Sequence, residues 1–131
     1  MKPTHLGYQT TIDFYNCKNQ AINACDFIEK TLLEAANIIG LTVVNTTIHE
    51  FSPIGVSGVV VIEESHIAIH TWPEHNYVAI DFFTCNNSFS LTDGVNWLKE
   101  QFDASHFTSK DFTRGNLETI STLKNSLKHE L

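Results

Sequence analysis

Three strand-like runs follow one another in the middle of the chain, at residues 56–62, 66–72 and 77–84. They are rich in β-branched and aromatic residues, and each break between them holds only a few residues. Residues 73–76, with the sequence PEHN, are expected to form a hairpin connection. Strands joined by such short turns pair in the antiparallel direction, and this constraint limits the folds open to the chain.

Further strands are expected on both sides of this central run. Residues 8–15 and 41–51 precede it, and residues 106–112 follow it as a closing strand. Residues 52–55, with the sequence SPIG, are typical of a turn. The sheet should therefore contain four consecutive strands flanked by one strand from each end of the chain.

Two helices and an amphipathic tail complete the expected elements. The first helix should run from a cap at Asn19 to about Ile39, where Gly40 stops it. The second should be capped near Ser90 or Thr92. The apolar stripe of the first helix consists of Cys25, Ile28, Leu32, Ala35, Ala36 and Ile39, and the residues of the second helix expected to face inward are Val95, Leu98 and Phe102. The amphipathic tail is marked by Leu117, Ile120, Leu123 and Leu127.

The order of these elements predicts an α+β fold in which an antiparallel sheet carries both helices on one face. The 131 residues are expected to form a single domain with two layers. The other face of such a sheet must be covered. A second copy of the chain is the economical cover, so we expect a homodimer with an αββα arrangement.

Composition excludes several classes of partner. The formal net charge is −7, which disfavours nucleic acid, and no apolar stretch is long enough to span a membrane. The three cysteines form no CxxC pair, which argues against a zinc site and a disulfide framework. We therefore expect a protein of the reducing cytoplasm.

Residues 55–85 contain an unusual concentration of reactive side chains. Glu64 leads directly into Ser65 and His66, and further histidines follow at positions 70 and 75. A zinc site on His66 and His70 is unfavourable, because four residues along a strand separate them by roughly 13 Å. The GxSxG motif of many serine hydrolases is also missing around Ser65.

The same segment resembles the short prokaryotic S-adenosylmethionine decarboxylase proenzymes. The resemblance rests on GVSGVVVIEESHIAIHTWPE and on AIDFFTC, which follows after Tyr77, and it extends from about Gly7 to Gly115. Glu63 stands where the family commonly has serine, and Gln9 where it often has histidine.

The resemblance implies that the chain cleaves itself between Glu64 and Ser65, giving a β chain of residues 1–64 and an α chain of residues 65–131. Ser65 would then become a covalent pyruvoyl group, so neither pyridoxal phosphate nor a metal is expected. This group would form a Schiff base with S-adenosylmethionine and release carbon dioxide. The product is the aminopropyl donor for spermidine synthesis.

Five further roles follow from the resemblance. Ser57 and His70 match residues that assist the cleavage, the first at the oxyanion and the second as a base. Cys85 matches the proton donor of decarboxylation. Phe51 matches an aromatic residue that stacks on adenine, and Glu74 matches a carboxylate that binds ribose. Without the motif, each of these residues would be assigned an ordinary structural place.

Strand geometry supports an active site shared between two chains. Ser65 and His70 are five residues apart, so on one continuous strand they face opposite sides, roughly 16 Å apart. In the family each site combines residues of both protomers, which implies two α and two β chains. Three alternatives remain: a pyruvoyl-dependent arginine or ornithine decarboxylase, a non-catalytic partner of an active relative, and a small ligand-binding module.

Overall fold

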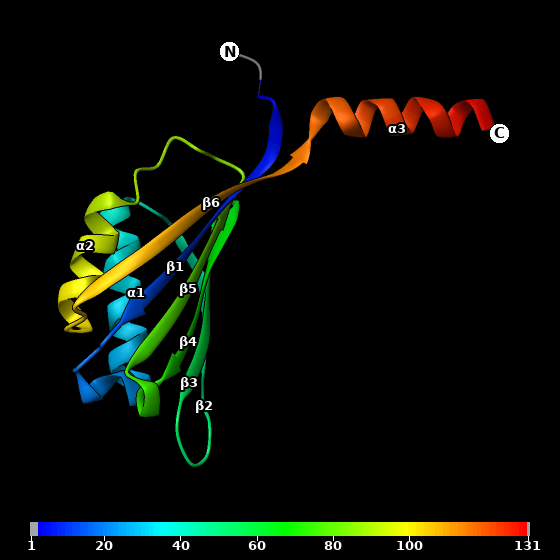
Figure 1. The fold of residues 1–131 in the computed structure, drawn as a ribbon. Helices are drawn as coiled ribbons and strands as arrows, with labels where there is room; N and C mark the ends of the chain where they lie inside the picture. Colours follow the sequence, from blue (N-terminus) through cyan, green and yellow to red (C-terminus); the bar gives the residue numbers. More distant parts are fainter. Residues whose placement is uncertain (1–2, 131) are drawn as a thin grey trace.

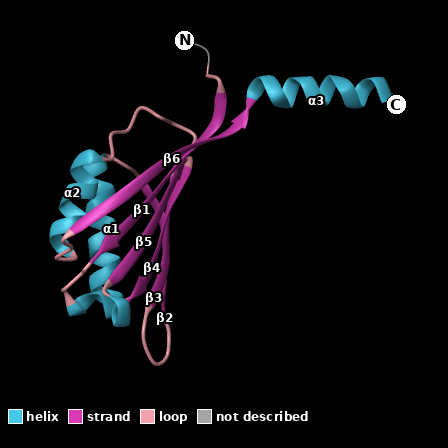
Figure 2. Ribbon diagram, viewed as in Figure 1, coloured by secondary structure: helices cyan, strands magenta, loops and turns pink. Residues whose placement is uncertain are grey.

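The computed structural model describes residues 3–130, which fold around a six-stranded sheet with helices on one face (Figures 1 and 2). The spatial order of the strands is β2-β3-β4-β5-β1-β6, and every neighbouring pair is antiparallel. The predicted α+β class and the antiparallel meander are confirmed. The strands are β1 (His5–Tyr15), β2 (Val43–Glu50), β3 (Val56–Ile62), β4 (Ser65–Trp72), β5 (Tyr77–Thr84) and β6 (His106–Asn116).

Helices α1 (Cys25–Ile39) and α2 (Thr92–Gln101) lie together on one side of the sheet (Figure 1). There are also two short 3-10 turns: η1 (Gln20–Asn23) precedes α1, and η2 (Pro73–His75) joins β4 to β5. The core lies between the helices and the sheet. Its fully buried members include Ile28 and Leu32 from α1, Ile69 and Val78 from the strands, and Phe102 at the end of α2.

The expected first helix is divided in two at its N-terminal end. The Asn19 side chain accepts a hydrogen bond from the Ala21 backbone N–H at 3.0 Å, so it caps η1 and not α1. Ala24 is extended, with φ −110°, and α1 begins only at Cys25. The helix ends as predicted, because Gly40 adopts φ 93° and its N–H donates to the Ala36 carbonyl oxygen.

The cap predicted for the second helix is wrong. Leu91 occupies the capping position, with no side-chain hydrogen bond, and α2 starts at Thr92. The predicted inward face is confirmed, since Val95, Leu98 and Phe102 are all buried. A side-chain cap typically contributes about 1 kcal/mol, and burial of this apolar face outweighs that amount, which explains why the helix forms without a cap.

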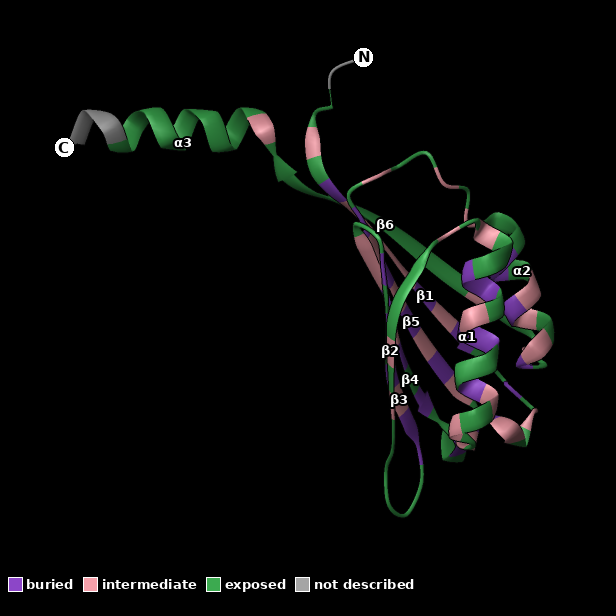
Figure 3. Ribbon diagram, turned by 180° about the vertical axis from the view of Figure 1, so that it is seen from behind, coloured by how far each residue is buried: buried purple, intermediate pink, exposed green. Residues whose placement is uncertain are grey.

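The two faces of the sheet differ in exposure. On β4, Ile67, Ile69 and Thr71 are buried beneath the helices, whereas His70 and Trp72 point to the opposite face and are exposed. On the neighbouring strand β3, Val59 and Val61 lie on that same uncovered face and are 39% and 42% exposed. The uncovered face therefore carries apolar side chains that the single chain leaves in contact with solvent. The burial colours of Figure 3 show the contrast, since most of β2 is exposed whereas α1 carries buried residues.

A third helix, α3 (Leu117–Glu130), follows β6 directly and extends away from the rest of the molecule (Figure 1). Ile120, Leu123 and Leu127 recur along it at helical spacing and are exposed. The predicted amphipathic tail is thus a helix that contacts mainly the end of β6 and leaves these three apolar side chains exposed. Across residues 3–130, each helix is too short or too polar to cross a bilayer.

Candidate active site

Glu64 and Ser65 lie at the tight turn that joins β3 to β4. Ile62 and Ser65 pair across the two strands, so Glu63 and Glu64 alone form the connection. Glu64 adopts φ 61°, a left-handed conformation that is uncommon and strained for a residue other than glycine. Ser65 begins β4, and its hydroxyl donates a hydrogen bond to the Glu63 carbonyl oxygen at 3.1 Å.

Cys85 reaches this turn from the end of β5. Thr84 pairs with Ser65 across the two strands, which places the next residue, Cys85, beside Glu64. The Cys85 backbone N–H donates to the Glu64 carbonyl oxygen at 3.0 Å, and the Cys85 residue is exposed. A hydrogen bond to this oxygen polarises the Glu64 carbonyl toward nucleophilic attack. We call Glu64, Ser65 and Cys85 the cleavage cluster.

Ser57 and His70 form a pair at the other end of the β3–β4 hairpin. They are directly opposite one another in the register, and the Ser57 Oγ lies 2.8 Å from the His70 Nδ1. Both side chains lie on the uncovered face, because their strand neighbours Val56 and Ile69 are buried beneath the helices. A serine hydroxyl bonded to an imidazole can serve as a hydrogen-bond donor beside a general base.

Phe51 and Glu74 lie at the same end of the sheet as this pair. Phe51 follows β2 in the loop that hangs from the lower end of the sheet in Figure 1, and it is 49% exposed. Glu74 belongs to η2, just after the end of β4, and is also exposed. We call Phe51, Ser57, His70 and Glu74 the helper cluster.

The structure thus separates the predicted site residues into two clusters at opposite ends of the sheet. Strand β4 runs without interruption from Ser65 to Trp72, so Ser65 and His70 are roughly 16 Å apart along it. They also face opposite sides, since Ser65 alternates in step with the buried Ile67 and His70 with the exposed Trp72. Within one chain these two side chains do not meet.

One residue of the helper end was not singled out from the sequence. His49 pairs directly with Ser57 across β2 and β3, and its ring lies 4.8 Å from that of Phe51 between centroids. The alternation of side chains along a strand offered a signal, because His49 precedes Phe51 by two residues. The register with Ser57 could not be obtained in this way.

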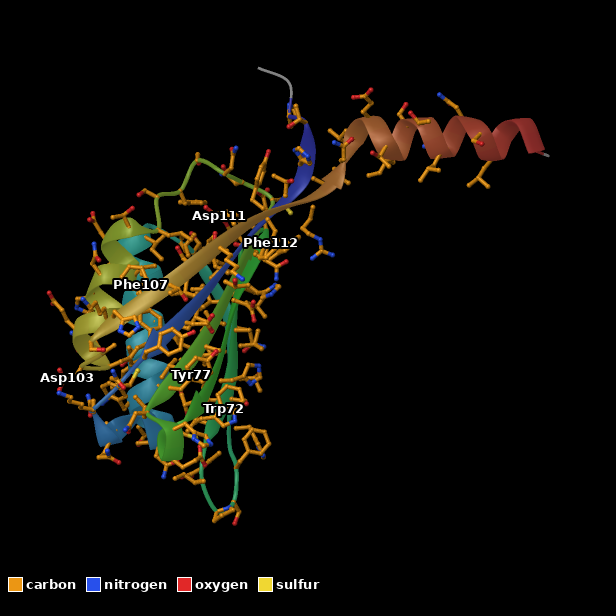
Figure 4. The ribbon with its side chains drawn as sticks, in the orientation of Figure 1. Trp72, Tyr77, Asp103, Phe107, Asp111 and Phe112 are labelled. Carbon is orange, nitrogen blue, oxygen red and sulfur yellow. The ribbon has the colours of Figure 1, made fainter. Side chains whose placement is uncertain are left out.

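Aromatic rings continue along the uncovered face beyond the helper cluster. The His70 and Trp72 ring centroids are 6.1 Å apart, and the Trp72 and Tyr77 centroids are 5.4 Å apart, as their adjacent positions in Figure 4 illustrate. The Tyr77 hydroxyl donates a hydrogen bond to Asp13. Burial, together with this bond, raises the pKa of Tyr77 above its usual value, so the phenol stays protonated.

A cavity of about 630 Å³ lies on the other, helix-covered side of the sheet. It is bounded by α2, by the segment after β5 and by β6, from which Phe107 and Asp111 contribute (Figure 4). It adjoins the cleavage cluster through Thr84 and Asn86, on either side of Cys85. The helper cluster lies on the opposite face, so this cavity does not join the two clusters.

The other two cysteines have a structural character. Cys17 is fully buried and its thiol donates to the Phe14 carbonyl oxygen at 3.5 Å. Burial raises the pKa of Cys17 to about 11, which keeps the thiol protonated and unreactive near neutral pH. Desolvation by burial, followed by the nearby carboxylates, also raises the pKa of Cys25. No group of three or more metal-ligating side chains occurs among the described residues.

Comparisons with known proteins identify the family. Residues 8–115 match the family described as S-adenosylmethionine decarboxylase. An S-adenosylmethionine decarboxylase proenzyme of Acidithiobacillus ferrooxidans is 42% identical over 94% of this chain and 92% of its own length. One from Acetivibrio thermocellus is 45% identical over 86% of this chain and 91% of its own.

A solved structure agrees with the sequence comparisons. The adenosylmethionine decarboxylase of Aquifex aeolicus has a TM-score of 0.77 and 27% identity, covering 86% of this chain and 93% of its own. All residues of the cleavage cluster and of the helper cluster lie within residues 8–115, the range that matches the family. The chain therefore belongs to the S-adenosylmethionine decarboxylase family.

Proposed function

We propose that this chain is the precursor of an S-adenosylmethionine decarboxylase and that it cleaves itself between Glu64 and Ser65. The observation that carries the proposal is the hydrogen bonding and backbone conformation of Glu64, whose carbonyl carbon would be attacked. Its oxygen is held by the Cys85 N–H, its residue has a strained left-handed backbone, and the next residue is a serine. Membership of the family favours this activity over arginine or ornithine decarboxylation and over a non-catalytic partner.

The cleavage begins with attack of the Ser65 Oγ on the Glu64 carbonyl carbon. The hydroxyl, now bonded to the Glu63 oxygen, must first rotate toward that carbon. A C–O bond forms, the C–N bond of the peptide breaks, and the nitrogen of residue 65 becomes a free amine. The negative charge that develops on the carbonyl oxygen during the attack is stabilised by the Cys85 N–H of the same chain and by the Ser57 hydroxyl, which must come from a second chain because Ser57 lies at the opposite end of the sheet.

The second half of the cleavage needs a base. Removal of the α-proton of residue 65 expels the Glu64 carboxylate and leaves dehydroalanine, and water then replaces the nitrogen, releasing ammonia. His70, held by Ser57, is the base that we assign to this step. The products are the two chains 1–64 and 65–131, which remain associated through the β3–β4 pairing.

The residues at the new terminus fit a pyruvoyl group, since Ser65 begins a strand beside an exposed thiol. Such a ketone, when present, supplies an electron sink for decarboxylation. The Cys85 thiol is then the proton donor to the α-carbon of the substrate. Phe51 offers an exposed ring to adenine and to the sulfonium, and Glu74 offers a carboxylate to the ribose hydroxyls.

We further propose that the active molecule is a homodimer in which each site combines two chains. The two clusters lie at opposite ends of one sheet, and the uncovered face exposes apolar residues such as Val59, Val61 and Trp72. Two sheets packed through these faces would give the αββα arrangement, and an antiparallel relation brings the end of one sheet, where the Glu64–Ser65 turn lies, to the end of the partner sheet that carries the helper cluster. Sedimentation analysis should give twice the mass of one chain, and a stable monomer with full activity would refute the sharing.

The three cysteines, all of which are free thiols, suit a reducing compartment. We therefore assign the enzyme to the cytoplasm. Fractionation of the source cells with an antibody against the α chain should place it in the soluble cytoplasmic fraction, and recovery from an oxidising compartment would contradict the assignment.

The experiment for the activity combines intact mass with substrate choice. Purified wild-type protein should give two chains that meet between positions 64 and 65, the second with a carbonyl in place of its terminal amine. Carbon dioxide should be released from S-adenosylmethionine and not from arginine or ornithine. The Ser65→Ala variant should stay in one piece and be inactive, whereas Ser88→Ala, a change at an exposed serine, should behave as wild type. An uncleaved, active wild-type chain would refute the proposal.

A further inference from the structure

His49 lies in line with the pair that assists the cleavage. It sits on β2, at the edge of the sheet, and pairs directly with Ser57 on β3, which in turn pairs with His70 on β4. Directly paired residues of antiparallel strands point to the same face, with their Cβ atoms about 5 Å apart. The row His49, Ser57 and His70 therefore crosses three strands on the uncovered face.

The His49 ring contacts Phe51 and not the hydroxyl of Ser57. The two ring planes meet at 83°, with centroids 4.8 Å apart, which is the edge-to-face arrangement that aromatic pairs favour. The Ser57 hydroxyl is already engaged by the His70 Nδ1 at 2.8 Å. His49 thus belongs to the same end of the sheet as the helper cluster but has a different contact within it.

Phe51 needs such a contact to hold one orientation. It lies outside any strand, at the start of the β2–β3 loop, and is 49% exposed. Its backbone is fixed, since its N–H donates to the Gly55 carbonyl oxygen at 2.8 Å, but its side chain is free to change rotamer. An edge-to-face contact with His49 restricts that freedom and still leaves at least one face of the Phe51 ring open.

We propose that His49 is a positioning residue for the substrate, which holds the Phe51 ring ready to stack on the adenine base. This inference rests on the proposed function, because it takes the adenosyl group as the ligand of Phe51. His49 acts before the substrate arrives: a ring that is already oriented loses less conformational freedom on binding. Because His49 pairs with Ser57 and Ser57 pairs with His70, the His49 side chain lies at the same end of the sheet as these two residues.

The position of the contact predicts which step should respond. Phe51 meets the substrate and takes no part in the cleavage of the chain, so His49→Leu should cleave at the wild-type rate. The KM for S-adenosylmethionine should rise about two- to tenfold, the range that corresponds to the loss of one aromatic pair. The kcat should stay within a factor of about two, because the reacting groups are unchanged.

A matched set of variants separates positioning from a general effect on the fold. His49→Phe keeps an aromatic ring against Phe51 and should restore the KM. Phe51→Ala should raise the KM, and adding His49→Leu to it should raise it no further, since the ring to be positioned is gone. The control is His106→Leu, at an exposed histidine at the start of β6. The His106 ring stacks on the Tyr15 ring, with centroids 5.1 Å apart, far from Phe51 in the sheet order. The KM of this variant should equal that of wild type.

Three results would overturn the inference: an unchanged KM in His49→Leu, a loss of cleavage in that variant, or the same rise in KM in His106→Leu. The second result would show that His49 serves the Ser57–His70 pair. Binding of adenosine, measured by calorimetry, gives a readout that does not require turnover. It should weaken in His49→Leu by the same factor. A wild-type protein that binds adenosine but releases no carbon dioxide would contradict the proposed decarboxylation, whereas equal adenosine binding by wild type and His49→Leu would contradict the role of His49.

Discussion

The cleavage end and the helper end of the sheet are built in different ways. At the cleavage end the key features belong to the backbone: Glu64 has a strained left-handed conformation, and its carbonyl oxygen accepts a hydrogen bond from the Cys85 N–H. At the helper end, side chains of paired strands meet, as the Ser57 Oγ and the His70 Nδ1 do at 2.8 Å. One strand, β4, carries both ends, which keeps them roughly 16 Å apart in a single chain.

This difference teaches how one chain can prepare a reaction without completing it. The cleavage cluster has the bond to be broken and its first nucleophile, but the base lies at the other end of the strand. The helper cluster has the base and the substrate contacts, but no bond to break. Two chains placed in opposite directions would supply both sets of residues twice.

Removal of the base should have the largest effect. The His70→Ala variant should form chains 1–64 and 65–131 about 10²–10⁴ times more slowly than wild type, the usual contribution of a general base. The rate is measured by following the intact chain by mass after synthesis. His75→Ala, at an exposed histidine of η2 close by, should cleave normally. Normal cleavage of His70→Ala would show that the helper end takes no part in it.

A change at Cys85 should separate the backbone from the side chain. The Cys85→Ala variant keeps the N–H that bonds the Glu64 carbonyl oxygen, so cleavage should proceed. It loses the thiol, so release of carbon dioxide with correct protonation should fall by about 10²-fold. Mass spectrometry follows the first step and radiolabelled carbon dioxide the second. If both steps slowed equally, the thiol would be needed for the cleavage as well.

Relief of strain at Glu64 should have the smallest effect. Glycine adopts φ 61° without penalty, so Glu64→Gly should stabilise the precursor by about 1 kcal/mol and slow cleavage by about fivefold, if the strain is released as the bond shifts. Glu64→Ala, which also lacks the carboxylate but keeps the strain, is the control and should cleave near the wild-type rate. Equal cleavage rates for the two variants would show that backbone strain at Glu64 does not promote the cleavage.

Much of this arrangement was predictable from periodicity. The strands at 56–62 and 77–84 were placed correctly, because their alternation of buried and exposed residues is regular. The division of the first helix at Ala24 was missed, since the apolar spacing continues across the break. The cap of α2 was assigned to a polar residue by propensity, although burial of Val95 and Leu98 decides where that helix forms.

The contacts within the site required the register of the sheet. The sequence alone does not state that Thr84 pairs with Ser65, which is what brings the Cys85 N–H to Glu64. The same applies to His49, which meets Ser57 only through the pairing of β2 with β3. The family resemblance named most residues of the site, but their separation into two ends follows from the straight course of β4.

The most direct test of a site shared between two chains is a mixed dimer of Ser65→Ala and His70→Ala chains, produced together in one cell. Alone, the Ser65→Ala chain should stay uncleaved and inactive, and the His70→Ala chain should cleave only at its much reduced rate and show almost no activity. Together they should cleave part of the His70→Ala chains and restore about a quarter of wild-type activity, because half of the dimers are mixed and each has one complete site of two. If mixed dimers form but show neither cleavage nor carbon dioxide release, the two clusters do not act across chains.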